Sequence, residues 1–207
     1  MRKILILAVL ALALPTAVFA YSSIDYGNIG GTLAVSNAVG PAVLMLNGSV
    51  LTTITGMPGG TPLTGSNLGS VSFTTGLLTS GSLALGGTFA GGGTFMITGN
   101  GSNGAPTGVI FTGTFVGPVT WALMTNSVDG THTYTLSGTL SGTTASGFKT
   151  TGSTIQLTVN TGLGHFNGSV GVSSGDTNIV VPEPGSLGLL GTGLIGLAGV
   201  VRRKLKA

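Results

Sequence analysis

The sequence of 207 residues contains no cysteine, and charged residues make up only 5% of it. Without cysteine the chain can form no disulfide, no thiolate metal site and no cysteine nucleophile. Histidine is nearly as scarce, with two residues in the whole chain. Enzyme active sites are usually built from clustered acids, histidines or other titratable groups. The sequence therefore predicts no enzyme activity, no cofactor and no metal ligands.

The few charges are unevenly distributed along the chain. The formal net charge is +3, yet six of the seven basic residues lie near the two ends. Residues 21–181 contain three aspartates and one lysine, Lys149, so this central part is slightly acidic. Recognition of a phosphate backbone needs several clustered cations. Nucleic acid is therefore excluded as a partner.

The first part of the chain, 1–20, has the organisation of a secretory signal peptide. The basic pair Arg2-Lys3 precedes eleven consecutive apolar residues, 4–14. Ala20 then supplies a small residue directly before Tyr21. An apolar run of this length is too short for a permanent membrane anchor. We expect cleavage between Ala20 and Tyr21, and hence export.

Residues 21–180 are expected to form one β domain rich in glycine and threonine. In three stretches, 109–123, 131–140 and 154–159, apolar residues alternate with threonine and serine. This period of two predicts strands with one buried face, and threonine suits the outward positions. The predicted core includes Phe111, Phe115, Trp121, Tyr134, Leu136, Ile155 and Leu157.

Shorter strands and glycine-rich loops are predicted elsewhere in this domain. The segments 56–69 and 99–108 are rich in glycine, proline and serine, which is typical of loops. Asn-Gly pairs, which favour tight turns with positive φ, recur in the domain, and three of them begin at Asn47, Asn100 and Asn167. The shorter predicted strands are 42–46, 49–54, 70–74, 82–85 and 94–98.

The domain shows no sustained helical period, so the sequence predicts an all-β fold. Closely spaced strands joined by polar turns favour an antiparallel β-sandwich with a jelly-roll-like order. A β-solenoid is the alternative, since it also tolerates abundant glycine and threonine. The Gly-Thr-Phe triplets that begin at 87, 93 and 113 are unequally spaced, however, so they define no fixed repeat.

The C-terminal tail, 181–207, combines three features in a defined order. Pro182-Glu183-Pro184 comes first, an uncharged apolar run over 187–201 follows, and the basic cluster Arg202-Arg203-Lys204 closes it. The run predicts a membrane helix at the lower limit of the spanning length. The basic cluster is expected to remain cytoplasmic, which puts the β domain on the opposite side of that membrane.

This order closely resembles the PEP-CTERM sorting signal of exported bacterial proteins. The resemblance implies that an exosortase, a membrane-embedded protease, recognises Pro182, Glu183 and Pro184. It also implies that Arg202, Arg203 and Lys204 act as the cytoplasmic stop while the chain is held in the inner membrane. Transfer to the cell envelope or the extracellular matrix would follow, where exopolysaccharide is a further expected partner.

Two functions stay open for the β domain itself. The first is a non-catalytic structural or adhesive role at the cell surface, and the second is that of a carbohydrate-binding module. Trp121 is predicted on the inward face of its strand, which favours a core position over a sugar-stacking platform. Asp129 and His132 could form a catalytic pair, although a turn aspartate followed by a strand-start histidine is the simpler interpretation.

Overall fold

The structure is a computed structural model that describes residues 21–36, 42–57, 60–126 and 128–182. Contacts divide the chain into two compact units, 23–181 and a second unit made of 1–22 and 182–207. The described strands lie in the first unit, apart from the strand ends that border it. Its strands are β1 (Tyr21–Ile29), β2 (Thr32–Ser36), β3 (Val43–Thr55), β4 (Leu63–Thr74), β5 (Leu78–Ser82), β6 (Gly86–Phe89), β7 (Gly92–Asn100), β8 (Thr107–Phe115), β9 (Val119–Thr125), β10 (His132–Thr144), β11 (Lys149–Gly162) and β12 (Ser169–Pro182), with a short 3-10 helix, η2 (Ser102–Gly104).

Several neighbouring strands are two halves of one longer extended run. β1 and β2 pair with successive parts of β3, and β8 and β9 pair with successive parts of β10. In the same way, β4 pairs with β7, and β5, which follows β4, pairs with β6, which precedes β7. The described strands therefore form eight runs: 21–36, 43–55, 63–82, 86–100, 107–125, 132–144, 149–162 and 169–182.

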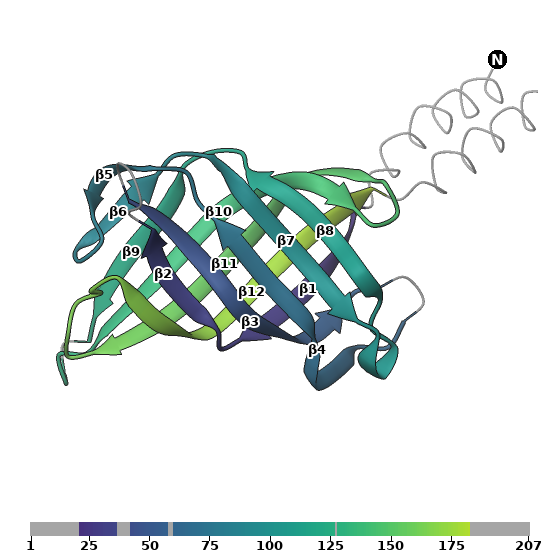
Figure 1. The fold of residues 1–207 in the computed structure, drawn as a ribbon, viewed down its shortest axis with the longest axis horizontal. Coiled ribbons are helices and arrows are strands. Elements are labelled where there is room, and N and C mark those ends of the chain that lie inside the picture. The colour runs from purple at the N-terminus through teal and green to yellow at the C-terminus, as the bar shows by residue number, and fades with distance from the viewer. Residues whose placement is uncertain (1–20, 37–41, 58–59, 127, 183–207) are drawn as a thin grey trace, which may run out of the picture. The chain divides into compact units, whose positions relative to one another are not determined.

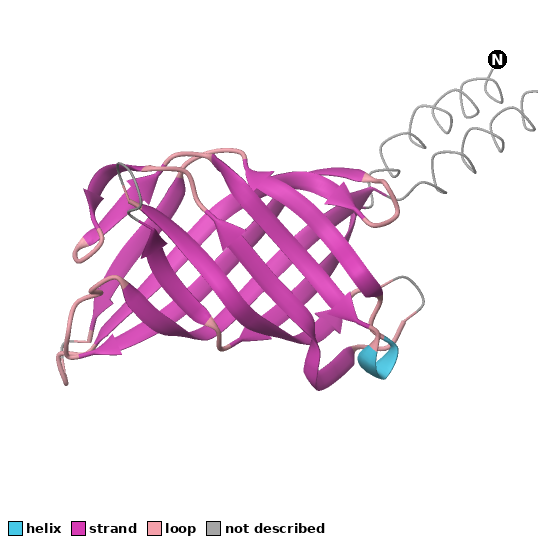
Figure 2. Cartoon of the chain, in the orientation of Figure 1, coloured by secondary structure: helices cyan, strands magenta, loops and turns pink. Residues whose placement is uncertain are grey.

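These runs form a consecutive antiparallel meander that closes on itself. Each run pairs with the next along the chain, and β12 returns to pair with β2. All twelve strands belong to one sheet, whose front and back strands cross in Figure 1. Figure 2 shows that the described part of the chain is almost entirely strand, with the short 3-10 helix η2 in cyan. Closure leaves few free strand edges, which are the usual sites of aggregation.

The core lies inside the closed sheet, because successive residues of a strand point to opposite faces. All seven residues predicted for the core are buried, with exposed fractions of 0–2%. Phe73, Phe95, Phe111 and Phe115 form one aromatic group, with ring centroids 5.7–6.3 Å apart. An eight-stranded closed sheet has an interior just wide enough for side chains to fill.

The prediction of an antiparallel all-β fold is confirmed. The apolar faces from opposite sides of the sheet pack against each other, as the two layers of the predicted sandwich would. The strand order differs from a jelly roll, because each run pairs with its sequence neighbour. Alternation of residue types defines which side chains face inward, but it carries no information on which strands pair.

Some predicted boundaries were wrong. The loop expected over 56–69 ends earlier, because Leu63 begins β4 and pairs with Ile54 of β3. Of the strand predicted over 82–85, only Ser82 is in a strand, as the last residue of β5, and residues 83–85 form a turn. Asn47-Gly48 lies within β3 instead of separating two strands, and the positive φ of 67° at Gly48 coincides with a register shift between β3 and β4. A bulge of this kind absorbs a turn-like residue without ending the strand.

The run predicted over 109–123 is interrupted at 116–118, where Pro118 has no N–H to donate. Phe111, Phe115 and Trp121 nevertheless all face the core, as the alternation predicted. Val109 is the exception, with half of its side-chain surface exposed.

Among the described residues, no helix is long and apolar enough to cross a membrane. The predicted signal helix over 1–20 and the predicted membrane helix over 187–201 both lie outside the described residues.

Candidate binding surfaces

One end of the closed sheet is built around a stack of aromatic side chains. Trp121 of β9 and Tyr134 of β10 stack with ring centroids 4.8 Å apart and planes 11° from parallel. Phe166, from the loop between β11 and β12, packs edge-on against Trp121 at 5.4 Å. Trp121 is 1% exposed, so its indole belongs to the core, as the inward-facing position predicted.

The tip of the β5–β6 hairpin covers this stack through two carbonyl groups. The Trp121 indole Nε1–H donates to the Leu83 carbonyl oxygen at 2.9 Å. The Tyr134 hydroxyl donates to the Ala84 carbonyl oxygen at 2.6 Å. Buried indole and phenol groups need such partners, because an unpaired buried polar group is costly. The hairpin is thereby fixed over the end of the sheet.

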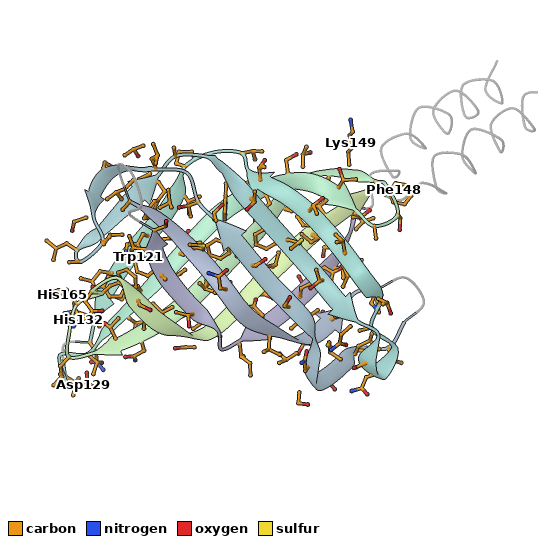
Figure 3. All side chains as sticks on the ribbon, viewed as in Figure 1. Trp121, Asp129, His132, Phe148, Lys149 and His165 are labelled. Atoms are coloured by element: carbon orange, nitrogen blue, oxygen red, sulfur yellow. The ribbon has the colours of Figure 1, made fainter. Side chains whose placement is uncertain are left out.

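The Tyr134 hydroxyl also organises the loop that precedes β12. It accepts a hydrogen bond from the Phe166 backbone N–H at 3.1 Å and lies 3.2 Å from His165 Nδ1. His165 and His132, the first residue of β10, are in turn in ring contact with centroids 4.3 Å apart. The two histidines of the chain thus lie side by side at the end labelled in Figure 3.

Asp129, which the sequence allowed as a catalytic partner of His132, is hydrogen-bonded within its own turn. Asp129 Oδ1 accepts hydrogen bonds from the Thr131 N–H at 3.0 Å and the Thr131 hydroxyl at 2.7 Å. These bonds, that from the backbone first, lower the pKa of Asp129. No hydrogen bond joins Asp129 to His132 among the described residues. The aspartate instead closes the turn between β9 and β10, as the simpler interpretation predicted.

Four large apolar side chains surround this end of the sheet and remain in contact with water. Leu85 follows the hairpin tip, Met124 lies near the end of β9, Val128 lies in the β9–β10 turn and Leu163 follows β11. Their exposed fractions are 65–92%. We call these four residues the apolar rim. A clustered set of exposed apolar residues marks an interaction surface more often than scattered ones do.

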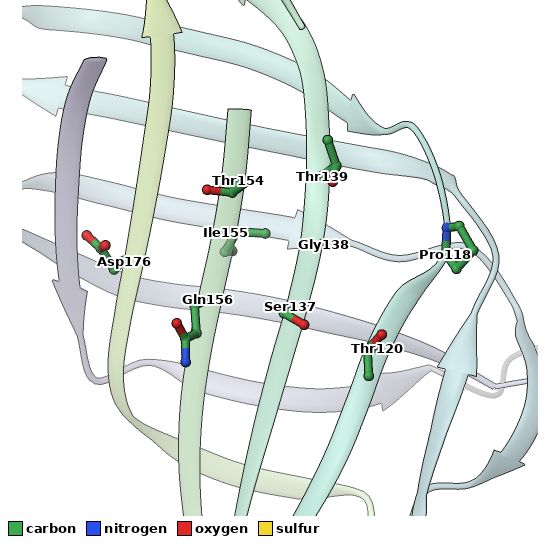
Figure 4. Close-up of a pocket in the computed structure, with 9 residues that line it drawn as sticks. All are labelled: Pro118, Thr120, Ser137, Gly138, Thr139, Thr154, Ile155, Gln156 and Asp176. Atoms are coloured by element: carbon green, nitrogen blue, oxygen red, sulfur yellow. The ribbon is translucent and has the colours of Figure 1, made fainter. Parts of the chain in front are cut away.

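A second candidate surface is a shallow polar groove of about 420 Å³ on the outer face of β9 to β12. Figure 4 shows its side chains on four neighbouring strands. Burial first, and the negative charge of Asp25 second, raise the pKa of Asp176 in this groove. The polar side chains that line the groove are Thr120, Ser137, Thr139, Thr154, Gln156 and Asp176.

Only two of the predicted processing residues fall within the described strands. Tyr21 is the first residue of β1 and Pro182 the last of β12. These two strands are neighbours in the sheet and are also linked by a side-chain hydrogen bond from Asn178 Nδ2 to Asp25 Oδ1. The remaining predicted site residues, Ala20, Glu183, Pro184, Arg202, Arg203 and Lys204, lie outside the described residues.

Comparison with protein families identifies the tail. Residues 180–204 match the family model of the PEP-CTERM protein-sorting motif. The resemblance predicted from the Pro-Glu-Pro sequence, the apolar run and the basic cluster is thus confirmed. The match implies export, processing by an exosortase and an extracellular destination. No curated protein and no solved structure matches the chain.

The two surfaces of the β domain were not predicted from the sequence. The groove depends on which strands are neighbours, and strand pairing is not encoded in residue alternation. The contact between His132 and His165 joins residues 33 positions apart. The available signal was that an aromatic residue closely follows each histidine. Tyr134 comes two residues after His132, and Phe166 comes directly after His165.

Proposed function

We propose that this chain is a non-catalytic protein of the bacterial surface, sorted by an exosortase, whose β domain is adhesive. The observation that carries the adhesive role is the apolar rim, in which four large side chains are at least 65% exposed at one end of the sheet. Burying apolar surface stabilises a complex by about 25 cal/mol for each Å² removed from water. A rim of this kind therefore favours contact with another surface.

The direction of β12 supports this role. β12 begins after the loop that holds His165 and runs along β11 toward Lys149, at the opposite end of the sheet. The sorting motif begins at residue 180 of that strand. The part of β12 that enters the sorting motif therefore lies toward the opposite end of the sheet from the apolar rim.

A non-catalytic role fits the titratable groups of the domain. In the part of the chain that the structure describes, no group of three or more His, Asp or Glu side chains comes together. Asp129 accepts a hydrogen bond from Thr131, and Asp25 accepts one from Asn178. General acid–base chemistry needs a positioned acid and base with access to one substrate atom. We therefore propose that the domain binds and does not convert its partner.

Adhesion of the native host provides the test. A strain lacking the gene would be complemented with the wild type or with a variant in which Leu85, Met124, Val128 and Leu163 are all serine. The control variant carries serine at four exposed apolar positions away from this end, Ile29, Leu77, Val109 and Val116. We expect attachment to fall severalfold with the rim variant only. Equal attachment by the rim variant at equal surface abundance would contradict the proposal.

A second candidate function is carbohydrate binding, which the polar groove favours. Its hydroxyl, amide and carboxylate groups lie on neighbouring strands of a rigid sheet. Such groups can form the dense hydrogen bonds that a neutral polysaccharide offers, and the groove presents no cation that would select a phosphate or sulfate. Binding sites combine a concave shape with a few placed polar groups. The exopolysaccharide of the host is the proposed ligand.

Affinity electrophoresis in gels that contain the host exopolysaccharide tests this candidate. The variant Gln156→Ala with Asp176→Asn removes groove groups from β11 and β12. Thr112→Ala is the control, since Thr112 is exposed on β8 outside the groove. We expect the retardation of the wild type to be lost in the groove variant and kept in the control. Equal migration of all three proteins with and without polysaccharide would rule the groove out as a sugar site.

A further inference from the structure

The chain contains two histidines, and the fold brings both into contact at one end of the sheet. His132 begins β10, and His165 lies in the loop between β11 and β12. Their ring centroids are 4.3 Å apart and their planes are tilted by 47°. His165 is exposed and His132 is half-buried, so the pair can be reached from solvent.

The hydrogen bonds of Tyr134 determine the tautomer of His165. A phenol has one hydrogen to donate, and Tyr134 donates it to the Ala84 carbonyl oxygen. The contact between Tyr134 Oη and His165 Nδ1 at 3.2 Å must then be a bond that His165 donates. In the neutral ring, Nδ1 therefore carries the hydrogen and Nε2 carries a free lone pair. Metal-binding histidines show this arrangement, with the second ring nitrogen bonded to a protein acceptor.

His132 supplies the second observation. Its Nδ1 is buried and has no hydrogen-bond partner among the described residues. Leaving a buried polar atom unpaired is unfavourable, so native structures keep few such atoms without a reason. A metal ion coordinated by this nitrogen would provide the partner that the described residues do not.

We propose that His132 and His165 form a binding site for a divalent transition-metal ion, with Cu²⁺ bound most tightly. Imidazole nitrogen suits Cu²⁺, Ni²⁺ and Zn²⁺, and Cu²⁺ stands highest in the general affinity order. His165 binds the ion through Nε2, and one nitrogen of His132 is the second ligand. No third His, Asp or Glu lies in the group within the described residues, so water completes the coordination. The site is independent of both the sorting motif and the adhesive role.

Copper titration of the full chain in detergent micelles tests the site. The protein is purified with a histidine-free affinity tag, and excess glycine in the buffer suppresses weak binding to the backbone and the terminal amine. We expect saturation at one Cu²⁺ per chain. Pulsed electron paramagnetic resonance of the complex should then detect two coordinated imidazoles in the wild type. That measurement needs no variant and so does not depend on how a substitution affects folding.

Two variants separate the pair from other groups at this end. His165→Ala, at an exposed position, should weaken Cu²⁺ binding at least tenfold and leave a single imidazole signal. Asp129→Asn, the matched control, removes the nearby carboxylate and should leave the affinity unchanged. The far-ultraviolet circular dichroism of both variants verifies the fold. Absence of saturable binding, a wild-type signal from one imidazole, or unchanged affinity in His165→Ala would each overturn the proposal.

Discussion

Phe115 illustrates how one side chain connects several strands across the interior. Its ring contacts Phe73 of β4 edge-on at 5.7 Å and Phe95 of β7 at 6.3 Å. On β10, Gly138 leaves the space that the ring occupies, because a Cβ there would lie 2.8 Å from Phe115 Cδ1. The pairing of a large with a small residue fills the interior without a void, as close packing requires.

Replacing Phe115 by alanine should therefore strongly destabilise the domain. The Phe→Ala change in a core costs about 3–5 kcal/mol, a large share of the roughly 5–15 kcal/mol of a typical domain. Thr114→Ala, at an exposed neighbouring position, should change stability by less than about 0.5 kcal/mol. Urea denaturation followed by Trp121 fluorescence measures both. Similar midpoints for the two variants would contradict the inward orientation of Phe115.

Tyr26 of β1 makes the stability of the domain sensitive to alkali. Burial raises the pKa of its hydroxyl from 10.0 to about 12. Above pH 10 the unfolded state loses this proton while the folded state keeps it, so the unfolded state binds fewer protons and stability falls as the pH rises. The loss should reach roughly 2–3 kcal/mol by pH 12, at 1.36 kcal/mol per pKa unit.

Denaturant titrations at pH 9, 10, 11 and 12 measure this loss. Tyr26→Phe removes the ionisable hydroxyl and keeps the ring, so its stability should fall less steeply across the same range. A variant whose alkaline slope equals that of the wild type would show that other groups cause the loss.

Three glycines form a line along which three neighbouring runs change direction. Gly76 separates β4 from β5, Gly91 separates β6 from β7, and Gly117 separates β8 from β9. The backbones approach closely here, since a Cβ at Gly76 would lie 2.4 Å from the Gly91 carbonyl oxygen. Glycine at such interruptions allows a sheet to bend sharply, which closure of the sheet requires.

Gly76→Ala should accordingly destabilise the domain by about 1–3 kcal/mol, the usual cost of overpacking. Gly117→Ala is the matched control on the same line, because a Cβ there would meet nothing within 4 Å. Thermal unfolding followed by circular dichroism compares the two. Equal melting temperatures would mean that the strands can separate along this line at no measurable cost.

At the scale of the element, the sequence predicts strands well where apolar residues and threonine alternate. Tyr134, Leu136 and Leu157 were assigned to the core from this alternation, and all are fully buried. The glycine-rich segments gave less reliable boundaries. Asn47-Gly48 has the composition of a tight turn, yet the pairing of Asn47 with β2, and of the flanking Leu46 and Ser49 with β4, holds it inside β3. Tertiary hydrogen bonding overrides local turn preference at that point.

At the scale of the whole molecule, the closed meander could not be predicted from the sequence. Closure depends on the pairing of β12 with β2, which joins Gly171 to Thr32 across most of the chain. The candidate surfaces follow from the pairing of successive strands, which makes β9 to β12 neighbours and places His165 near the start of β10. The tail is the opposite case, since its Pro-Glu-Pro sequence and basic cluster are contiguous and identify the motif directly.

Processing of the tail should depend on Glu183. If an exosortase recognises Pro182, Glu183 and Pro184, then Glu183→Ala should leave the full-length precursor in the inner membrane of the native host. Folding of the β domain should be unaffected, because its described strands end at Pro182. Mass spectrometry of the C-terminal peptide distinguishes the two forms. An intact tail from Arg202 to Ala207 on the wild-type surface protein would contradict the sorting prediction.

The junction between the sheet and the tail leads to a further prediction. The sorting motif begins at residue 180, while β12 continues to Pro182, so the two overlap. Within the overlap, the Val180 N–H donates to Ser153 Oγ at 3.1 Å, and each such bond contributes about 0.5–1.5 kcal/mol. An enzyme that binds the segment around Pro182 apart from the sheet must therefore break the hydrogen bonds that hold the end of β12.

A flexible Gly-Ser linker inserted between Val181 and Pro182 should relieve this restriction and accelerate processing. The same linker inserted in the exposed turn after Asp129 is the control for added length. Pulse labelling in the native host, with the precursor and the processed form resolved by mass, measures both rates. Processing should become faster for the junction insertion and stay at the wild-type rate for the control. If the rates are equal, the end of β12 is already accessible to the enzyme, and pairing of this strand does not limit sorting.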